Sequence, residues 1–176
     1  MGKSAQKIIP NRYQVVPRTL CFVTHGPHGD DVLLLRGAPD KRIWPNQYNG
    51  VGGHVEPNED VRSAALREIQ EETGLEVRAL RLRGVINIPV DTRSTMGIMV
   101  FVFTAIATTR NVRPSEEGTL EWVARDRLAE LAVGEELVED LPTMLPRVLA
   151  MGPDEPPFFA HYRYDEQDRL VITFSE

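Results

Sequence analysis

The chain contains a single cysteine, Cys21, among its 176 residues. One thiol excludes an intrachain disulfide framework and any zinc site built from several cysteines. Aromatic residues are sparse at 7%, but 41% of the residues are hydrophobic, which is enough to bury a core. This composition excludes global disorder and is compatible with the reducing cytoplasm, where we expect the protein to act.

Long apolar runs and an excess of positive charge are lacking as well. The longest apolar run, Ile98 to Phe103, is far short of the ~18 residues that a membrane-spanning helix needs. We expect no targeting segment, and Gln6 stands where the myristoylation pattern requires Ser or Thr. The net charge of −6 argues against a nucleic-acid or membrane partner. We therefore expect a small-molecule ligand, with metal ions to bind it if it is anionic.

The first part of the chain is predicted to form a hairpin followed by one strong helix. A polar lead-in, residues 1–17, precedes the hairpin. Over residues 61–73 apolar side chains recur at i, i+4 and i+8, which indicates one buried helix face. Asp60 is the expected N-cap of this helix and Gly74 its left-handed stop. The strands expected in this part are 19–24, 31–36 and a short glycine-rich strand at 50–55.

The rest of the chain alternates further strands with shorter helical segments. No linker in it is long or polar enough to divide the chain, so we expect one domain over residues 1–176. Runs of strands with one central helix and several late helices predict an α+β or layered α/β architecture. The expected strands are 77–89, 98–108, 120–123, 158–164 and 170–174, the last two forming a hairpin, and the expected helices are 125–131, 135–141 and a turn or helix around 143–151.

Three glutamates are clustered on the predicted helix. Glu68, Glu71 and Glu72 occupy positions i, i+3 and i+4, so they project within an arc of about 100°. Like charges this close repel one another unless a cation lies among them. Clustered carboxylate oxygens suit Mg²⁺ or Mn²⁺, which also bind phosphates. The alternative is a solvated helix face, because paired glutamates are common on helix surfaces.

Arg67 and two glycines accompany this cluster. Arg67 lies beside the glutamates and can pair with Glu59 from the preceding loop, which would tie the loop to the helix. Gly52 and Gly53 allow the backbone to approach a metal ion or a phosphate closely. We therefore expect a site for a metal ion and a phosphate where the loop meets the helix.

The segment Gly53–Leu75, GHVEPNEDVRSAALREIQEETGL, is similar to the signature of a known family. It matches the Nudix box, so the chain resembles the Nudix hydrolase superfamily. Asn58 departs from many members, which have glycine there. The resemblance implies the Nudix fold, an α+β fold in which a mixed β-sheet is sandwiched between helices and the box forms a loop–helix–loop. It also implies hydrolysis of a nucleoside diphosphate linked to another moiety, with Mg²⁺ or Mn²⁺ as cofactor.

The resemblance also implies roles for single residues. Glu59 would brace Arg67, and a carboxylate would take the proton of the attacking water. MutT-like nucleoside triphosphatases place a metal-binding acidic residue a few positions before a strand tryptophan; similarity to them favours Glu117, and the alternative is an acidic loop tip. The implied metal ligands are Gly53, Glu68, Glu71, Glu72 and Glu117, and the implied catalytic residues are Glu59, Arg67, Glu71 and Glu117.

Outside the box the chain is similar to the MutT homologues that hydrolyse oxidised purine nucleoside triphosphates. The segment YNGVGGHVE resembles their base-pocket stretch, so Tyr48, Asn49 and Val51 would line a base pocket, although Asn49 could instead be a turn residue. Trp44 could stack on the base or belong to the core. The candidates for the acidic pair that reads the base in this group are Glu139–Asp140 and Glu135–Glu136.

We therefore expect hydrolysis of a nucleoside triphosphate, oxidised or not, to the monophosphate and pyrophosphate. One alternative is an ADP-ribose or dinucleotide pyrophosphatase, because Pro89 downstream of the box is similar to a feature of the ADP-ribose subgroup. A second alternative is a non-catalytic Nudix-fold nucleotide sensor, but such modules usually lose box carboxylates that this chain keeps. The expected partner is a small-molecule nucleotide, and the expected assembly is a monomer or a homodimer.

Overall fold

The computed structural model describes residues 11–90 and 95–175, so the first ten residues of the predicted lead-in lie outside it. Within this part of the chain, no helix is long and apolar enough to traverse a lipid bilayer. In chain order the elements are β1 (Gln14–His25), β2 (Asp31–Gly37), β3 (Tyr48–Asn49), α1 (Val61–Thr73), β4 (Val77–Pro89), β5 (Met96–Ala107), β6 (Gly118–Ala124), the 3-10 turn η2 (Arg125–Arg127), α2 (Leu128–Val133), α3 (Leu141–Ala150), β7 (Phe158–Tyr164) and β8 (Leu170–Phe174).

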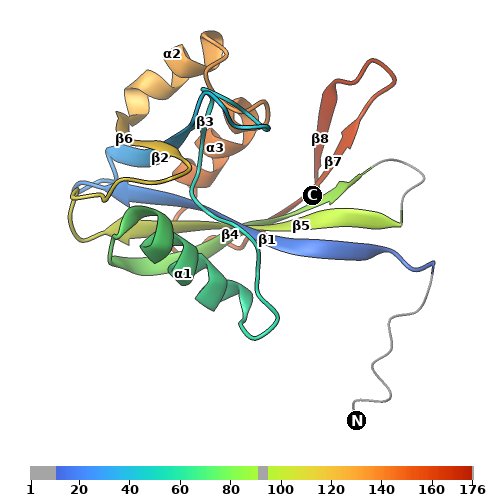
Figure 1. The fold of residues 1–176 in the computed structure, drawn as a ribbon, viewed down its shortest axis with the longest axis horizontal. Helices are drawn as coiled ribbons and strands as arrows, with labels where there is room; N and C mark the ends of the chain where they lie inside the picture. Colours follow the sequence, from blue (N-terminus) through green and yellow to red (C-terminus); the bar gives the residue numbers. More distant parts are fainter. Residues whose placement is uncertain (1–10, 91–94, 176) are drawn as a thin grey trace.

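The strands form one mixed sheet (Figure 1). Its order is β3-β2-β1-β5-β4-β7-β8, and β6 pairs with β2 outside this order. β1 runs parallel to β5 in unbroken register from Gln14↔Met96 to Thr24↔Ile106, and β4 runs parallel to β7. The other pairs are antiparallel, including the predicted hairpins β1–β2 and β7–β8. The β-branched and aromatic residues of β1 and β5 suit their central position.

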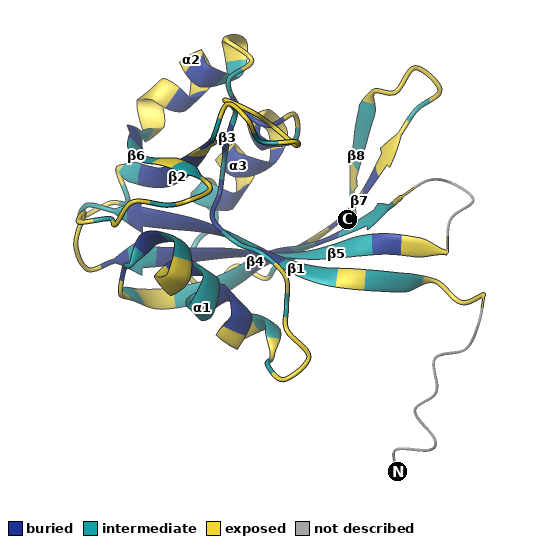
Figure 2. Cartoon of the chain, in the orientation of Figure 1, coloured by how far each residue is buried: buried dark blue, intermediate teal, exposed yellow. Residues whose placement is uncertain are grey.

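Successive side chains of β1 face two separate cores. Cys21 and Val23 pack with Ala65 and Ile69 of α1 on one face of the sheet. Phe22 packs on the other face, in the core to which α2 and α3 contribute. This alternation is the two-residue period of a strand buried on both faces. Helices therefore cover both faces (Figures 1 and 2), which confirms the predicted α+β fold with its sheet between helices.

Helix α1 begins and ends where the sequence predicts. Asp60 Oδ1 accepts the N–H of Arg62 at 2.8 Å and that of Ser63 at 3.0 Å. Gly74 follows the helix at φ 72°, and its N–H donates to the Gln70 carbonyl at 3.0 Å. These bonds satisfy backbone groups that a helix leaves unpaired at its ends. The buried face of α1 carries Ala64, Ala65, Ile69 and Thr73.

Two expected strand boundaries are wrong. Residues 14–17 belong to β1 rather than to a polar lead-in, because they pair with the first residues of β5. Residues 50–55 form no continuous strand, since only isolated bridges join them to β1. Gly52 has φ 148°, and this conformation interrupts extended pairing. The segment therefore lies along β1 as a loop.

The predicted helix at 135–141 does not form either. Glu135 adopts a positive φ of 55° after α2 ends, and Leu137 makes a bridge to Tyr48 of β3 instead. The apolar side chains of this segment are buried in the core without helical spacing. The next helix, α3, begins only at Leu141.

Candidate metal and nucleotide site

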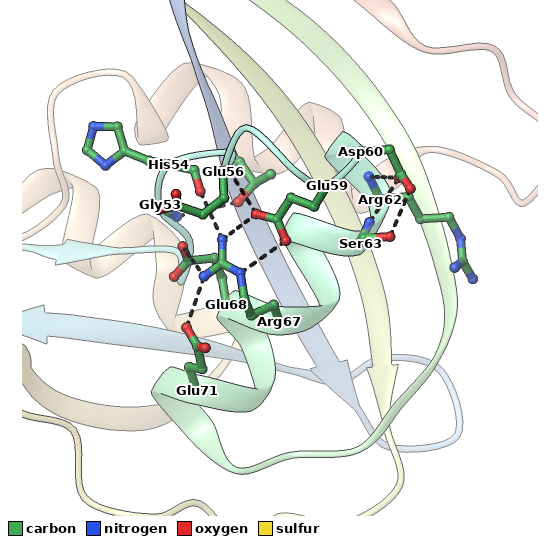
Figure 3. Close-up of polar contacts among 11 residues, drawn as sticks. Gly53, His54, Glu56, Glu59, Asp60, Arg62, Ser63, Arg67, Glu68 and Glu71 are labelled. Atoms are coloured by element: carbon green, nitrogen blue, oxygen red, sulfur yellow. Dashed lines mark hydrogen bonds and ion pairs between the residues drawn. The ribbon is translucent and has the colours of Figure 1, made fainter.

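Arg67 of α1 is at the centre of a polar network with the loop that precedes the helix (Figure 3). Its Nη2 lies 2.6 Å from Glu59 Oε1, and its Nε donates to Glu59 Oε2 at 3.1 Å. Nη2 also donates to the His54 carbonyl at 3.0 Å. These bonds confirm the predicted contact between Glu59 and Arg67. They lower the pKa of Glu59 and raise that of Arg67.

The same guanidinium binds two of the helix glutamates. Arg67 Nη1 donates to Glu68 Oε1 and to Glu71 Oε2, at 2.9 Å in each case. Only 13% of the Glu68 side chain is exposed, compared with 59% for Glu71. Glu68 therefore lies inside the site between helix and loop, whereas Glu71 lies at its edge (Figure 3).

The glycine loop between β3 and α1 is docked on β1 by backbone hydrogen bonds. The Thr19 N–H donates to the Gly53 carbonyl at 2.8 Å, and the Cys21 N–H donates to the Val51 carbonyl at 2.7 Å. A carbonyl oxygen has two lone pairs, so Gly53 can still accept a second partner. A Cβ on Gly53 would lie 2.5 Å from Glu68 Oε1. The missing side chain of Gly53 therefore makes room for the Glu68 carboxylate.

Glu72 is a partly buried carboxylate that contacts the same loop. Its Oε2 accepts the Gly52 N–H at 3.1 Å. Burial, together with the negative charges of Glu117 and Glu68, raises the pKa of Glu72 to about 7. A buried acid close to other carboxylates is costly unless a cation compensates it.

These carboxylates offer the hard oxygen donors that Mg²⁺ and Mn²⁺ prefer. Among the described residues, no three acidic, histidine or cysteine side chains converge closely enough to coordinate one ion as they stand. Arg67 binds Glu68, and Lys41 Nζ binds Glu117 at 2.7 Å. Release of these two ion pairs would free carboxylate oxygens beside Glu72. The donor chemistry therefore fits the expected divalent cation.

A pocket of about 320 Å³ opens beside Glu72 and the glycine loop. It combines apolar walls with a few polar groups, as ligand pockets usually do. Its apolar side chains come from Leu20, Leu35, Ile43, Ile86, Ile88 and Val100, and its polar ones include Lys41, Gln47, Asn49, Glu72, Glu117 and Asp140.

Three of the predicted substrate-binding residues, Trp44, Asn49 and Asp140, line this pocket. Trp44 is 45% exposed, so it does not belong to the core. Asn49 Oδ1 accepts the Gly50 N–H at 2.8 Å, which is the expected turn interaction. The amide nitrogen of Asn49 still has two hydrogens to donate. Both interpretations of Asn49 are therefore compatible with its position.

Tyr48 and Val51 do not line the pocket, contrary to the expectation. Tyr48 is 4% exposed, and its hydroxyl donates to Glu121 Oε2 at 2.5 Å. Val51 is fully buried in the core beneath α1. Because side chains alternate along extended backbone, a strand that turns Asn49 toward the pocket turns Tyr48 away from it.

Of the two candidate acidic pairs, only Asp140 reaches the pocket. Glu139 lies outside it, where its carboxylate accepts a hydrogen bond from the Tyr164 hydroxyl. Neither member of Glu135–Glu136 lines the pocket, and Glu136 pairs with Arg36 at 3.6 Å. Burial raises the pKa of Asp140 to about 6. Of the acidic pair expected to read the nucleobase, only the partly buried Asp140 therefore lies at the pocket.

Two cations of the pocket, Arg18 and Lys41, were not expected from the sequence. Arg18 Nε is buried, and it has no hydrogen-bond partner in the described part of the chain. Arg18 occupies the same face of β1 as the apolar Leu20 and Phe22. A charged residue in this otherwise apolar series is the sequence signal that could have identified Arg18 as a pocket residue. Lys41 lies in an irregular loop, whose sequence has no period from which its position follows.

A family model matches most of the chain, including the segments that carry these residues. The model of the NUDIX domain matches residues 16–147. The match includes the braced loop, α1 with its carboxylates, and the residues that line the pocket up to Asp140. The chain therefore belongs to the NUDIX domain family, as the segment Gly53–Leu75 predicts.

Curated relatives cover part of the chain. It is 34% identical over 96 residues to the "Uncharacterized Nudix hydrolase YvcI" of Bacillus subtilis (strain 168), which is 53% of this chain and 58% of that protein. It is 31% identical over 112 residues to the "Nucleoside triphosphatase NudI" of Enterobacter sp. (strain 638), which is 58% of this chain and 79% of that protein. The chain thus spans 58% of the length of YvcI.

Solved structures extend the likeness to nearly the whole chain. The crystal structure of a mutator MutT protein from Bacillus halodurans aligns with 92% of this chain and 98% of its own, with a TM-score of 0.71 and 23% sequence identity. At this identity the likeness establishes a shared fold. It therefore confirms the Nudix fold that the sequence resemblance implies.

Proposed function

We propose that this protein is a Nudix-type hydrolase that uses a divalent cation to cleave a pyrophosphate linkage in a nucleotide. The observation that carries the proposal is Glu72, a partly buried carboxylate with a pKa of about 7 that lines a pocket of about 320 Å³. The negative charges of Glu68 and Glu117 raise the pKa of Glu72, so a charged Glu72 is destabilising where it lies. A purely structural role does not account for a carboxylate in such a position. Non-catalytic Nudix-fold sensors usually lose box carboxylates, whereas this chain keeps Glu68, Glu71 and Glu72.

A divalent cation in this site would neutralise phosphate charge and increase the acidity of a water molecule. The ion pair of Arg67 with Glu59 fixes the distance between loop and helix, and so keeps the donors in place. Glu117 lines the pocket and Glu71 does not, so we assign proton acceptance to a carboxylate oxygen of Glu117. The groups that would bind the cation are the Gly53 carbonyl and the carboxylates of Glu68, Glu71, Glu72 and Glu117.

The substrate that we propose is a nucleoside triphosphate, cleaved to the monophosphate and pyrophosphate. Asn49 and Asp140 offer hydrogen-bonding groups for a base edge between the apolar side chains of Ile86 and Ile88, and Trp44 offers a ring for stacking. When Asp140 is protonated, it can donate a hydrogen bond as well as accept one. The name of the relative NudI, a nucleoside triphosphatase, also supports this choice.

A panel of nucleotides with Mg²⁺ tests the proposal. It should contain ordinary and oxidised purine nucleoside triphosphates, ADP-ribose and dinucleoside polyphosphates, with Glu72→Gln as the inactive reference. Release of monophosphate and pyrophosphate from a triphosphate is the expected result. Preferential release of AMP and ribose phosphate from ADP-ribose would replace the triphosphatase with the ADP-ribose alternative. Turnover of no substrate above the Glu72→Gln reference would overturn the hydrolase proposal.

A further inference from the structure

A second pocket, of about 380 Å³, shares no lining residue with the pocket beside Glu72. It lies between the end of β1, the first half of β4 and the C-terminal end of α3. None of the described residues that line it is an aspartate or a glutamate. Four arginines line it, in a chain whose net charge is −6: Arg78, Arg81, Arg83 and Arg125.

Arg83 is the innermost of these cations, with only 7% of its surface exposed. Its Nε donates to Thr104 Oγ1 and its Nη1 to the Gly152 carbonyl, both at 2.7 Å. Both acceptors are neutral. Burial lowers the pKa of Arg83, and the neighbouring charge of Arg81 lowers it further. Burying a charge in this way is costly when no ion of opposite sign accompanies it.

The surroundings of Arg83 compensate this charge only in part. Glu155 attracts it from a distance, but the Glu155 carboxylate accepts the Gly152 N–H at 3.0 Å. Asp30 adjoins Gly26 of the loop between β1 and β2. Neither carboxylate lines the pocket. Within the described part of the chain, no carboxylate of the pocket lining therefore balances the charge of Arg83.

The shape of the pocket indicates what kind of group that is. The loop Gly26–Gly29 lines it from the side of β1, and the Arg125 guanidinium lies against this loop, 3.3 Å from where a Gly29 Cβ would be. Guanidinium groups present planar pairs of N–H donors that match the oxygens of phosphate. Several of them around one cavity favour an anion with more than one negative charge.

We propose that this pocket binds a small multivalent phosphate anion of the size of pyrophosphate. Arg83 contacts the anion from the buried side, and Arg78, Arg81 and Arg125 surround it near the surface. The proposed cation site belongs to the other pocket, so binding here requires no divalent metal. This distinguishes the site from any phosphate subsite beside Glu72.

Calorimetric titration of pyrophosphate into the full chain, in chelator and at low salt, tests the proposal. The unmodified protein should bind, Arg83→Met should weaken binding at least about tenfold, and Arg81→Gln should weaken it several-fold. Arg163→Gln is the matched control, because Arg163 is an exposed arginine of β7 outside the pocket. Its affinity should equal that of the unmodified protein. Glu72→Gln should also bind normally.

Amide chemical shifts locate the anion independently of affinity. Pyrophosphate should shift the amide signals of Gly26 and Gly29. The same shifts are then measured with inorganic phosphate and with AMP. Shifts with pyrophosphate alone identify a free anion as the ligand, and shifts with AMP as well show that a nucleotide-borne phosphate is accepted. If Arg83→Met does not fold, Arg81→Gln carries the test. No binding at millimolar pyrophosphate, or an equal loss in Arg163→Gln, would overturn the proposal.

Discussion

Glu59 and Arg67 are joined by two hydrogen bonds, of 2.6 and 3.1 Å, although one residue lies in a loop and the other two turns into a helix. Only a loop that folds back over the first turns of α1 can bring them together. The same guanidinium binds Glu68 and Glu71. Arg67 therefore couples the position of the loop to the position of the carboxylates.

A double-mutant cycle should reveal this coupling. Glu59→Gln and Arg67→Gln should each lower the melting temperature and reduce turnover by roughly ten- to a hundredfold, because the donors of the site shift. The double variant should lose less than the two losses combined, since the second change removes the group that the first leaves unpaired. Arg169→Gln breaks the ion pair with Asp165 in the β7–β8 hairpin and should leave turnover unchanged. Strictly additive losses would show that the two residues act independently.

Removal of divalent cations should abolish hydrolysis. The carboxylates of Glu68, Glu72 and Glu117 repel one another without a cation, so Mg²⁺ or Mn²⁺ should restore activity. The melting temperature should rise with the logarithm of the metal concentration once the site is saturated. Turnover and thermal unfolding in chelator, followed by stepwise addition of each metal, measure both effects. Activity that persists in excess chelator would exclude the metal mechanism.

Substitution of two adjacent glycines should separate stability from activity. Gly52 has φ 148°, and a Cβ there would lie 2.3 Å from the Thr19 carbonyl oxygen, so Gly52→Ala should destabilise the fold. At Gly53 a Cβ would meet the Glu68 carboxylate, which is the end of a flexible side chain. Gly53→Ala should therefore melt near the unmodified protein but lose at least about tenfold in turnover. A Gly52→Ala protein that melts normally, or a Gly53→Ala protein that is destabilised but keeps its turnover, would contradict these two expectations.

Glu72→Gln should stabilise the metal-free protein at high pH and inactivate it. The pKa of about 7 in the folded state lies above the ordinary glutamate value of 4.5, so the proton is bound more tightly after folding. This stabilisation is complete below pH 4.5 and is lost as the pH rises through 7. The gain from Glu72→Gln should approach about 3 kcal/mol at pH 8 and be much smaller at pH 5. Turnover with Mg²⁺ should fall at least about a hundredfold.

Glu76→Gln provides the control for this variant, because Glu76 is an exposed glutamate at the end of the same segment. Its melting temperature and turnover should match those of the unmodified protein at both pH values. A Glu72→Gln protein that is less stable at pH 8 in chelator would show that the carboxylate has a structural role.

Asp140→Asn should change substrate binding and the pH dependence of stability. Burial raises the pKa of Asp140 from 3.8 to about 6, so its contribution to stability is complete below pH 3.8 and is lost as the pH rises through 6. The variant should therefore gain more in melting temperature at pH 8 than at pH 4.5. KM for the preferred triphosphate should rise roughly tenfold, because a hydrogen-bonding group of the pocket changes. Glu139→Gln, outside the pocket, should leave KM unchanged.

The local parts of the fold could be predicted from the sequence because their signals are local. The caps of α1 depend on Asp60 and Gly74, and the strand 158–164 depends on its run of aromatic residues. The helix predicted at 135–141 does not form. Leu137 and Val138 are buried because this segment pairs with a distant strand, and not because they lie on one face of a helix. Tertiary contacts of this kind leave no period in the sequence.

The same distinction applies to the site. The pairing of Glu59 with Arg67 follows from the spacing of one short segment. Asp140 reaches the pocket and Glu139 does not, because Asp140 lies at the start of α3. Tyr48 is turned away from the pocket and donates a hydrogen bond to Glu121 of another strand. Arg18 and Lys41 reach the pocket from β1 and from an irregular loop, so only the assembled sheet brings them to the carboxylates.

The parallel pairing of β1 with β5 also determines the order in which the molecule can fold. Each residue of β1 from Gln14 to Thr24 pairs with a residue of β5 between Met96 and Ile106, so more than half of the chain must be synthesised before β1 finds this partner. Contacts between such distant segments form slowly, because a long loop must close first. The glycine loop docks on Thr19 and Cys21 in the middle of β1. The segment proposed to bind the cation, although local in sequence, therefore gains its final support only late in folding.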